Sequence, residues 1–181
     1  MIGGANGASC VLAAKLMNTE PSGTVPHAPI LIAGDTLKVA EVYNQIMPKE
    51  HKRTVLVDTF KDEIEESLRI ADALGKDLFA IRLDTPSERG GVTPFLVKEL
   101  RAKLDLNGYH WVKIFVSGGL TPEKIRVLSE AGADSFGVGS YISGAPAIDM
   151  TMDIKCVGDK PVAKRGRIPG LIENDKLKKI L

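Results

Sequence analysis

The chain has 181 residues, of which 44% are hydrophobic and 26% are charged, a composition typical of a globular domain. Its 24 basic and 23 acidic residues leave a net charge of +1, which excludes a bulk attraction to nucleic acid or acidic membranes. Cys10 and Cys156 lie far apart without a metal-binding spacing, so we expect packing residues and no disulfide. The sequence also lacks a signal peptide and an apolar run of about 18 residues, so we expect a cytoplasmic protein.

The first part of the chain is predicted to be helical. A short helix is expected over residues 10–16, followed by a turn over 20–29. One further helix is predicted to begin at Thr24 to His27 and to run to about Ile46, with Pro29 tolerated near its first turn and Pro48 ending it.

From residue 54 onward, apolar strands alternate with amphipathic helices. The predicted strands cover residues 54–60, 78–84, 112–119 and 134–140, and the predicted helices cover 62–75, 94–108 and 121–132. Such alternation is typical of βαβ units and a parallel sheet. Four strands cannot close an eight-stranded barrel, so the predicted fold is α/β, part of an irregular (β/α) barrel.

The sequence changes character near residue 149. Gly158-Asp159 separates two alternating runs and predicts a β-hairpin across Val157 to Lys160, followed by a basic tail. The predicted organisation is therefore a partial barrel domain at 1–148, and a hairpin and tail of a small domain at 149–181.

Polar residues gather where the predicted strands end. Asp58 and Asp84 each follow an apolar strand, and Arg82 lies two residues before Asp84, so its side chain points to the same side. An arginine and a carboxylate on one face can hold a planar polar ligand and a ribose diol. The glycine turns at 118–119 and 137–139 also follow strands, where phosphorylated ligands commonly bind.

These residues also have structural interpretations. Arg82 and Asp84 could form a structural ion pair, and Asp58 could cap the helix that follows it. His27, which stands beside a turn, could be a solvated or structural side chain.

Six segments occur in the order found in type II phosphoribosyltransferases. They are residues 3–30 with the element GT-x-x-H at 23–27, LVDTF at 56–60, IRLDT at 81–85, VSGGL at 116–120, FGVGS at 136–140 and KPVAKRGR at 160–167. The chain closely resembles the nicotinate phosphoribosyltransferase branch of that family. The quinolinate and nicotinamide enzymes are similar but more distant.

The resemblance implies transfer of phosphoribose from phosphoribosyl pyrophosphate to nicotinate, giving nicotinate mononucleotide in NAD biosynthesis. It implies Mg²⁺, ATP coupling through a phosphorylated histidine, and a dimer with the active site at the subunit boundary. By the same resemblance His27 is the phosphorylated histidine, Arg82 contacts the base, Asp84 contacts the ribose or base, and Asp58 is a looser catalytic match. The implied substrate- and phosphate-binding residues are Thr24, Ser117, Gly118, Gly119, Gly137, Val138, Gly139 and Ser140. No residue is assigned to a metal.

The resemblance covers only the second half of family members. The aromatic residue that stacks on the base and the basic residues that hold the pyrophosphate have no counterpart in this sequence. We therefore expect this chain to be incomplete alone, and to work as a homodimer or with an N-terminal-half chain. Three other functions stay open: a quinolinate phosphoribosyltransferase, an unrelated barrel enzyme with a sugar-phosphate substrate, and a non-catalytic half or scaffold subunit.

Overall fold

The computed structural model describes residues 4–176 and 178. The chain divides into two units, one ending at Gly144 and the other beginning at Ala145; the sequence had placed this boundary at 148/149. Among the described residues, no helix is both long and apolar enough to cross a membrane. The helices of the first unit are α1 (Val11–Leu16), α2 (His27–Ala33), α3 (Thr36–Ile46), α4 (Glu63–Leu74), α5 (Pro94–Leu106), α6 (Pro122–Glu130) and α7 (Ser140–Ser143), with two 3-10 helices, η1 (Gly75–Asp77) and η2 (Ser87–Arg89). Its strands are β1 (Arg53–Leu56), β2 (Leu78–Leu83), β3 (Lys113–Val116) and β4 (Ser135–Phe136).

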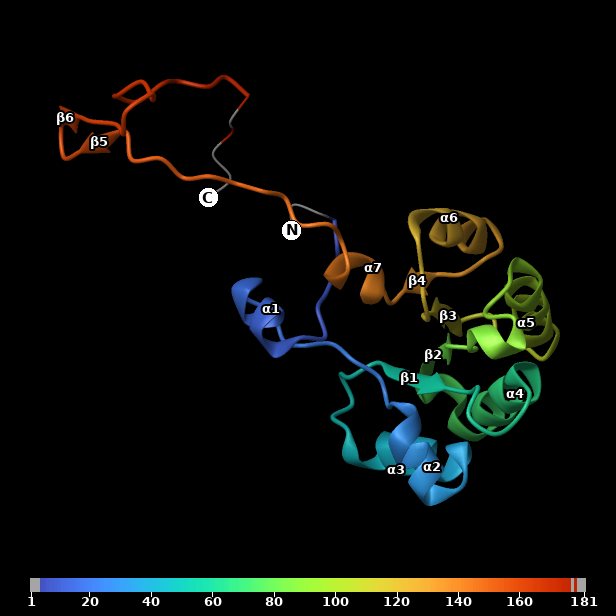
Figure 1. Ribbon diagram of the computed structural model, residues 1–181. Helices are drawn as coiled ribbons and strands as arrows, with labels where there is room; N and C mark the ends of the chain where they lie inside the picture. Colours follow the sequence, from blue (N-terminus) through green and yellow to red (C-terminus); the bar gives the residue numbers. More distant parts are fainter. Residues whose placement is uncertain (1–3, 177, 179–181) are drawn as a thin grey trace. The chain divides into compact units, whose positions relative to one another are not determined.

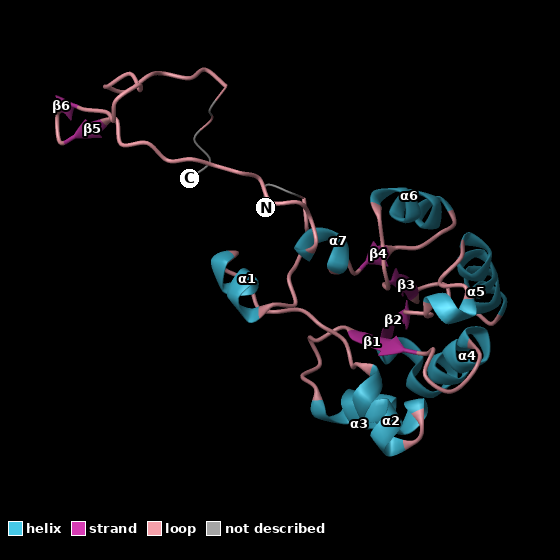
Figure 2. Ribbon diagram, viewed as in Figure 1, coloured by secondary structure: helices cyan, strands magenta, loops and turns pink. Residues whose placement is uncertain are grey.

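The four strands form one parallel sheet in the order β1-β2-β3-β4. Ile81 in β2 pairs with Val55 in β1 and with Ile114 in β3. Helices α4, α5 and α6 connect successive strands and lie along one side of the sheet (Figures 1 and 2). The predicted α/β fold with parallel strands is confirmed.

The three connecting helices begin with the same chemical device. Asp62, Thr93 and Thr121 precede α4, α5 and α6, and each side chain accepts hydrogen bonds from amides of the first turn. These amides have no partner within the helix, so such a cap stabilises the helix start. Pro94 and Pro122 then occupy the first helical position, where a missing N–H costs nothing.

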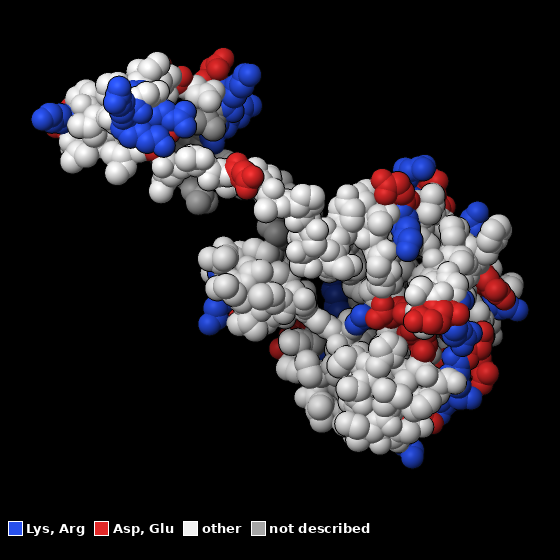
Figure 3. All heavy atoms as spheres, in the orientation of Figure 1, with Lys and Arg blue, Asp and Glu red and all other residues white. Residues whose placement is uncertain are grey.

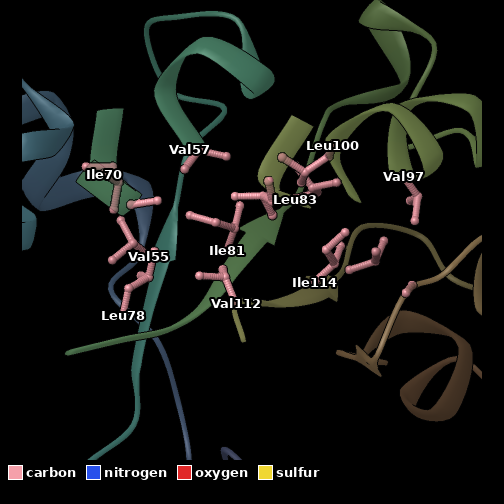
Figure 4. Close-up of a cluster of buried hydrophobic side chains, with 14 of the residues drawn as sticks. Val55, Val57, Ile70, Leu78, Ile81, Leu83, Val97, Leu100, Val112 and Ile114 are labelled. Carbon is pink, nitrogen blue, oxygen red and sulfur yellow. The ribbon is translucent and has the colours of Figure 1, made fainter. Parts of the chain in front are cut away.

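The hydrophobic core lies between the sheet and these helices (Figure 4). Val55, Ile81 and Ile114 come from three adjacent strands, and Ile70 and Leu100 come from α4 and α5. Each of the five is at most 3% exposed. Truncating Ile81 to alanine would therefore cost roughly 2–5 kcal/mol of unfolding free energy. This core fixes the strands whose ends carry the polar residues.

The prediction of one helix from residues 24–27 to Ile46 is wrong, because the chain forms two helices there. Gly34 follows α2 with φ of 75°, a left-handed conformation that ends a helix. Asp35 then caps α3, accepting from the Leu37 amide at 2.6 Å and the Lys38 amide at 3.3 Å. His27 consequently stands at the start of a separate helix of seven residues.

A buried guanidinium fastens the end of α3 to β1. Arg53 is 4% exposed, and it donates hydrogen bonds to the backbone carbonyls of Asn44, Met47, Pro48 and His51. The last carbonyls of a helix have no hydrogen-bond donor within it, so Arg53 supplies donors to the end of α3. The result is a rigid joint between the helical part that carries His27 and the sheet.

The second unit contains the antiparallel hairpin of β5 (Cys156–Val157) and β6 (Lys160–Pro161). Val157 pairs with Lys160, and Gly158 adopts φ of 57° in the turn, so the predicted hairpin is confirmed. Both cysteines are free thiols, with Cys156 half-buried and Cys10 exposed. The prediction that both are packing residues is therefore wrong for Cys10, which lies at the solvent-facing start of α1.

Candidate functional site

The carboxyl ends of the parallel strands bring most of the predicted site together. Asp58 follows β1, Asp84 follows β2, Ser117 follows β3 and Gly137 follows β4. Arg82 lies within β2 and joins this edge through its long side chain. Because the strands are parallel, all these positions open at the same edge of the sheet.

Arg82 is the centre of this group. Its Nε donates to the hydroxyl of Ser117 at 2.8 Å, and its two terminal nitrogens donate to Thr24 at 2.7 Å and to Asp84 at 2.9 Å. The Arg82–Asp84 pairing confirms that both side chains lie on one side of the strand. A guanidinium has five N–H groups, so these bonds to described residues leave one N–H on each terminal nitrogen for a ligand.

Thr24 and Ser117 therefore act on Arg82 in this structure. Both were predicted to bind substrate, and that direct role stays a prediction. Their hydroxyls accept from two sides of the guanidinium and fix its plane. A fixed plane favours a flat, bidentate partner such as a carboxylate.

His27 lies beside the same carboxylates. Its Nδ1 is 3.0 Å from the hydroxyl of Thr59, which sequence analysis did not identify. Its Nε2 is 3.9 Å from Oδ2 of Asp58 and 3.9 Å from Oδ2 of Asp84. The histidine side chain is 39% exposed, so Nε2 meets both the carboxylates and solvent.

Asp58 is the most deeply buried of these acids. Its side chain is 2% exposed, and neither oxygen has a hydrogen-bond partner among the described residues. Burial raises the pKa of Asp58; His27 opposes this rise, and the carboxylates of Asp84 and Glu63 add to it. The alternative that Asp58 caps the following helix is wrong, because Asp62 performs that role.

The two glycine turns have different roles. Gly118 has φ of 91°, and a Cβ there would lie 2.9 Å from Oδ1 of Asp84, so only glycine lets this turn pass the carboxylate. Gly119 is also left-handed, with φ of 54°. Gly137 instead donates its N–H to the Val116 carbonyl at 2.8 Å, so that amide is already occupied by sheet pairing. A Cβ at Gly137 would lie 3.1 Å from the Phe115 ring, so this position needs a residue as small as glycine.

The remaining predicted residues follow this second turn. Val138 packs against the core, and Gly139 with Ser140 starts the four-residue helix α7. The carbonyl of Gly139 accepts from the amides of Ile142 and Ser143. Their role toward a ligand stays a prediction.

A hollow of about 560 Å³ opens beside the Arg82 group. Its walls are the loop after β2, from Asp84 to Pro94, the turn from Gly118 to Leu120, and the start of α6. Lys124 on α6 lines it and donates to the Gly119 carbonyl at 3.2 Å. Lys124 was not predicted, because it stands in an ordinary charged helix pattern.

The charges of the first unit are distributed unevenly. Figure 3 shows acidic and basic side chains interspersed around the helices that cover the sheet, whereas the surface over α2 and α3 that faces the reader is largely uncharged. On α2, the apolar side chains of Leu31 and Ile32 are 58% and 88% exposed. The described residues contain no group of three or more His, Cys, Asp or Glu side chains placed to hold a metal ion.

The match to a family model identifies the chain. The model described as quinolinate phosphoribosyl transferase, C-terminal domain, matches residues 1–153. The chain belongs to this family. The type II phosphoribosyltransferase resemblance is therefore confirmed at the level of the family.

Individual relatives agree with that membership. The crystal structure of nicotinate-nucleotide pyrophosphorylase from Pyrococcus furiosus is 47% identical, with a TM-score of 0.80, over 94% of this chain and 43% of that one. Nicotinate phosphoribosyltransferase pncB2 of Mycobacterium tuberculosis is 32% identical over 82% of this chain and 32% of its own length. Nicotinate phosphoribosyltransferase pncB1 of the same organism is 36% identical over 62% of this chain and 24% of its length. The chain thus spans less than half of each relative.

The comparisons also bear on which base, nicotinate or quinolinate, is expected as the substrate. The nicotinate branch was expected first and the quinolinate enzyme second. The matching family model is named for quinolinate and the 47% identical solved structure for nicotinate-nucleotide pyrophosphorylase, whereas the two relatives called nicotinate phosphoribosyltransferase match at 32% and 36% identity.

Proposed function

We propose that the chain carries the part of a pyridine-carboxylate phosphoribosyltransferase that binds the ribose, its 5′-phosphate and the carboxylate of the base. Such an enzyme joins C1 of phosphoribosyl pyrophosphate to the ring nitrogen of the base, and pyrophosphate leaves. The observation that carries the proposal is the Arg82 group: one planar cation held by Thr24, Ser117 and Asp84 at the carboxyl edge of the sheet.

Each part of the group has a chemical task in this reaction. Arg82 would bind the carboxylate of the pyridine base through its two remaining terminal N–H groups. Positive charge grows on the ribose ring as pyrophosphate leaves, and the carboxylate of Asp84 would stabilise that charge. Asp58 would add to this stabilisation in its ionised form.

The turn at Gly118 and Gly119 would hold the 5′-phosphate. Its left-handed backbone lets the chain come close to Asp84, and Lys124 stands at the adjacent wall of the hollow. A phosphate held there would place the ribose between the turn and Arg82. Fixing the two reactants in this way lowers the entropic barrier to their reaction.

Quinolinate is the base we place first, because the family description and the 47% identical solved structure support it. Phosphoribosyl transfer to quinolinate is followed by loss of one carboxyl group as CO₂, and the ring carbon takes up a proton from solvent to give nicotinate mononucleotide. Transfer to nicotinate yields the same nucleotide without CO₂. Both transfers therefore give nicotinate mononucleotide and pyrophosphate, and only the quinolinate reaction releases CO₂.

Nicotinate with ATP coupling is the second candidate, and His27 is the observation that favours it. Nδ1 lies against the Thr59 hydroxyl, so Nε2 is the nitrogen open to a phosphoryl group. In this reaction Nε2 would attack the γ-phosphorus of ATP, ADP would leave, and water would later hydrolyse the N–P bond.

The resemblance also led us to expect Mg²⁺. Among the described residues, no group of three or more His, Cys, Asp or Glu side chains is placed to hold a metal ion. We propose that the ion enters with the pyrophosphate group of the substrate.

The proposal is tested with phosphoribosyl pyrophosphate, Mg²⁺ and either base, with and without a chain matching the unrepresented part of the relatives. Nicotinate mononucleotide and released CO₂ are measured together. Nucleotide with equimolar CO₂ supports the quinolinate type, and ATP-stimulated nucleotide without CO₂ supports the nicotinate type. An Arg82→Ala variant should lose either activity, whereas Arg126→Ala, a surface change on α6, should keep it. No nucleotide from either base in the complemented mixture would refute the proposal and leave the non-catalytic function.

A further inference from the structure

A buried carboxylate outside the predicted site holds the loop after β2 at two points. Glu63 is the first residue of α4, and its side chain is 4% exposed. Its Oε1 accepts from the Thr85 hydroxyl at 2.8 Å, and its Oε2 lies 3.6 Å from the Arg89 guanidinium. Thr85 is the chain neighbour of Asp84, so the first contact is next to a proposed substrate-binding residue.

The loop itself is a compact piece. The amides of Arg89 and Gly91 both donate to the Pro86 carbonyl, and the amide of Gly90 donates to the Ser87 carbonyl. These three bonds are local and few, so they persist only while the attachments of the loop to the rest of the chain hold it in place. Thr85 and Arg89 supply two such attachments, and both end on the same carboxylate.

The burial of Glu63 points to this linking role. An acid in the first turn of a helix is already favoured by the helix dipole when it is exposed, as Glu65 is with 63% of its side chain accessible. Burying a carboxylate is costly unless hydrogen bonds or an opposite charge compensate it. Thr85 and Arg89 provide that compensation. The burial of the Glu63 carboxylate is therefore compensated only when the loop is in place.

We propose that Glu63 is a positioning residue that fixes the loop Thr85–Gly91, and with it Asp84 and one wall of the hollow. This inference rests on the proposed function, in which Asp84 faces the ribose. Glu63 acts through Thr85 and has no contact with the substrate. Its loss would therefore loosen the loop, whereas the bonds of Arg82 to Thr24 and Ser117 do not involve the loop.

Hydrogen exchange on the 181-residue chain tests the structural part. In Glu63→Ala, the amides of Arg89, Gly90 and Gly91 should exchange about tenfold faster or more, as expected for loss of a hydrogen bond to a charged group. Glu65→Ala, two residues along the same helix, is the matched control and should leave these amides unchanged. Glu63→Gln keeps an acceptor for Thr85 and should restore part of the protection.

Two further variants keep the test decisive if Glu63→Ala fails to fold. Thr85→Val and Arg89→Ala leave the carboxylate in place and remove one attachment each, so each should raise exchange in the same three amides. Unchanged exchange in both would overturn the proposal.

Kinetics separate this inference from the proposed function. In the complemented enzyme, Glu63→Ala should raise KM for phosphoribosyl pyrophosphate and lower kcat, while Glu63→Gln recovers part of both, a pattern that simple destabilisation would not give. If the wild-type protein transfers no phosphoribose, the proposed function fails, and the exchange data still decide whether Glu63 holds the loop. Faster exchange with kinetics equal to wild type would overturn the positioning role.

Discussion

Arg82→Lys is the most specific perturbation of the candidate site, because it keeps the positive charge and removes the planar guanidinium with its several donor nitrogens. The guanidinium reaches Ser117, Thr24 and Asp84 with three different nitrogens at 2.8, 2.7 and 2.9 Å. A lysine ammonium is a single point and cannot span the three partners. We expect it to keep the bond to Asp84 and to lose those to the two hydroxyls.

The magnitude follows from those two lost bonds. A hydrogen bond that involves a charged group contributes roughly 1.5–3 kcal/mol, and water replaces part of it at a partly accessible site. The Arg82 side chain is 21% exposed, so the lower end of that range applies. We therefore expect the free energy of unfolding to fall by about 2–3 kcal/mol. For a chain of this size that fall corresponds to roughly 5–10 °C in Tm.

Urea unfolding followed by circular dichroism measures this change. Arg126→Lys is the control, since Arg126 is 69% exposed and pairs with Glu130 on the surface of α6. The control should stay within about 0.5 kcal/mol of wild type. A double-mutant cycle with Ser117→Ala should give a coupling energy of about 1 kcal/mol. If Arg82→Lys is as stable as the control, the guanidinium does not organise the site as described.

Three further predictions concern neighbouring positions. Gly118→Ala should lower the free energy of unfolding by about 1–3 kcal/mol, because its φ is 91° and the new Cβ meets Asp84. Gly108→Ala, at φ of 83° with open space around its Cβ, carries the backbone cost alone, so equal losses in thermal denaturation would disprove the clash. For Asp58, a raised pKa in the folded state means that stability is full below its ordinary value of 3.8 and declines as the pH rises through the folded pKa. Asp58→Asn should abolish that decline in unfolding experiments across pH, and parallel curves for both proteins would contradict it. His27→Ala should uncouple ATP hydrolysis from nucleotide formation while basal transfer persists, and an unchanged ratio of ADP to nucleotide would exclude His27 as the phosphoryl acceptor.

The sequence allowed the sheet and the centre of the site to be predicted because both follow local periodicity. A spacing of two along a strand is enough to place Arg82 beside Asp84, and apolar strands alternating with capped helices are enough to indicate a parallel sheet. The family resemblance added His27, which no local pattern links to the carboxylates.

Other parts depend on contacts that local patterns do not encode. Thr59 meets His27 from 32 residues away, and Glu63 meets Thr85 from 22 residues away. In the sequence, Glu63 looks like any acid in a first helical turn. The break between α2 and α3 was visible as Gly34-Asp35, but the apolar residues on either side suggested one continuous helix face.

The joint at Arg53 has a consequence for how the protein responds to its solution. Its partners are four backbone carbonyl oxygens and the side-chain oxygen of Asn44, at a site that is 4% exposed, so dissolved ions do not reach the contact. Concentrated salt will weaken surface pairs such as Arg126 with Glu130 while this anchorage stays intact. The attachment of α2 and α3 to the sheet should therefore be the same at high and at low salt concentration.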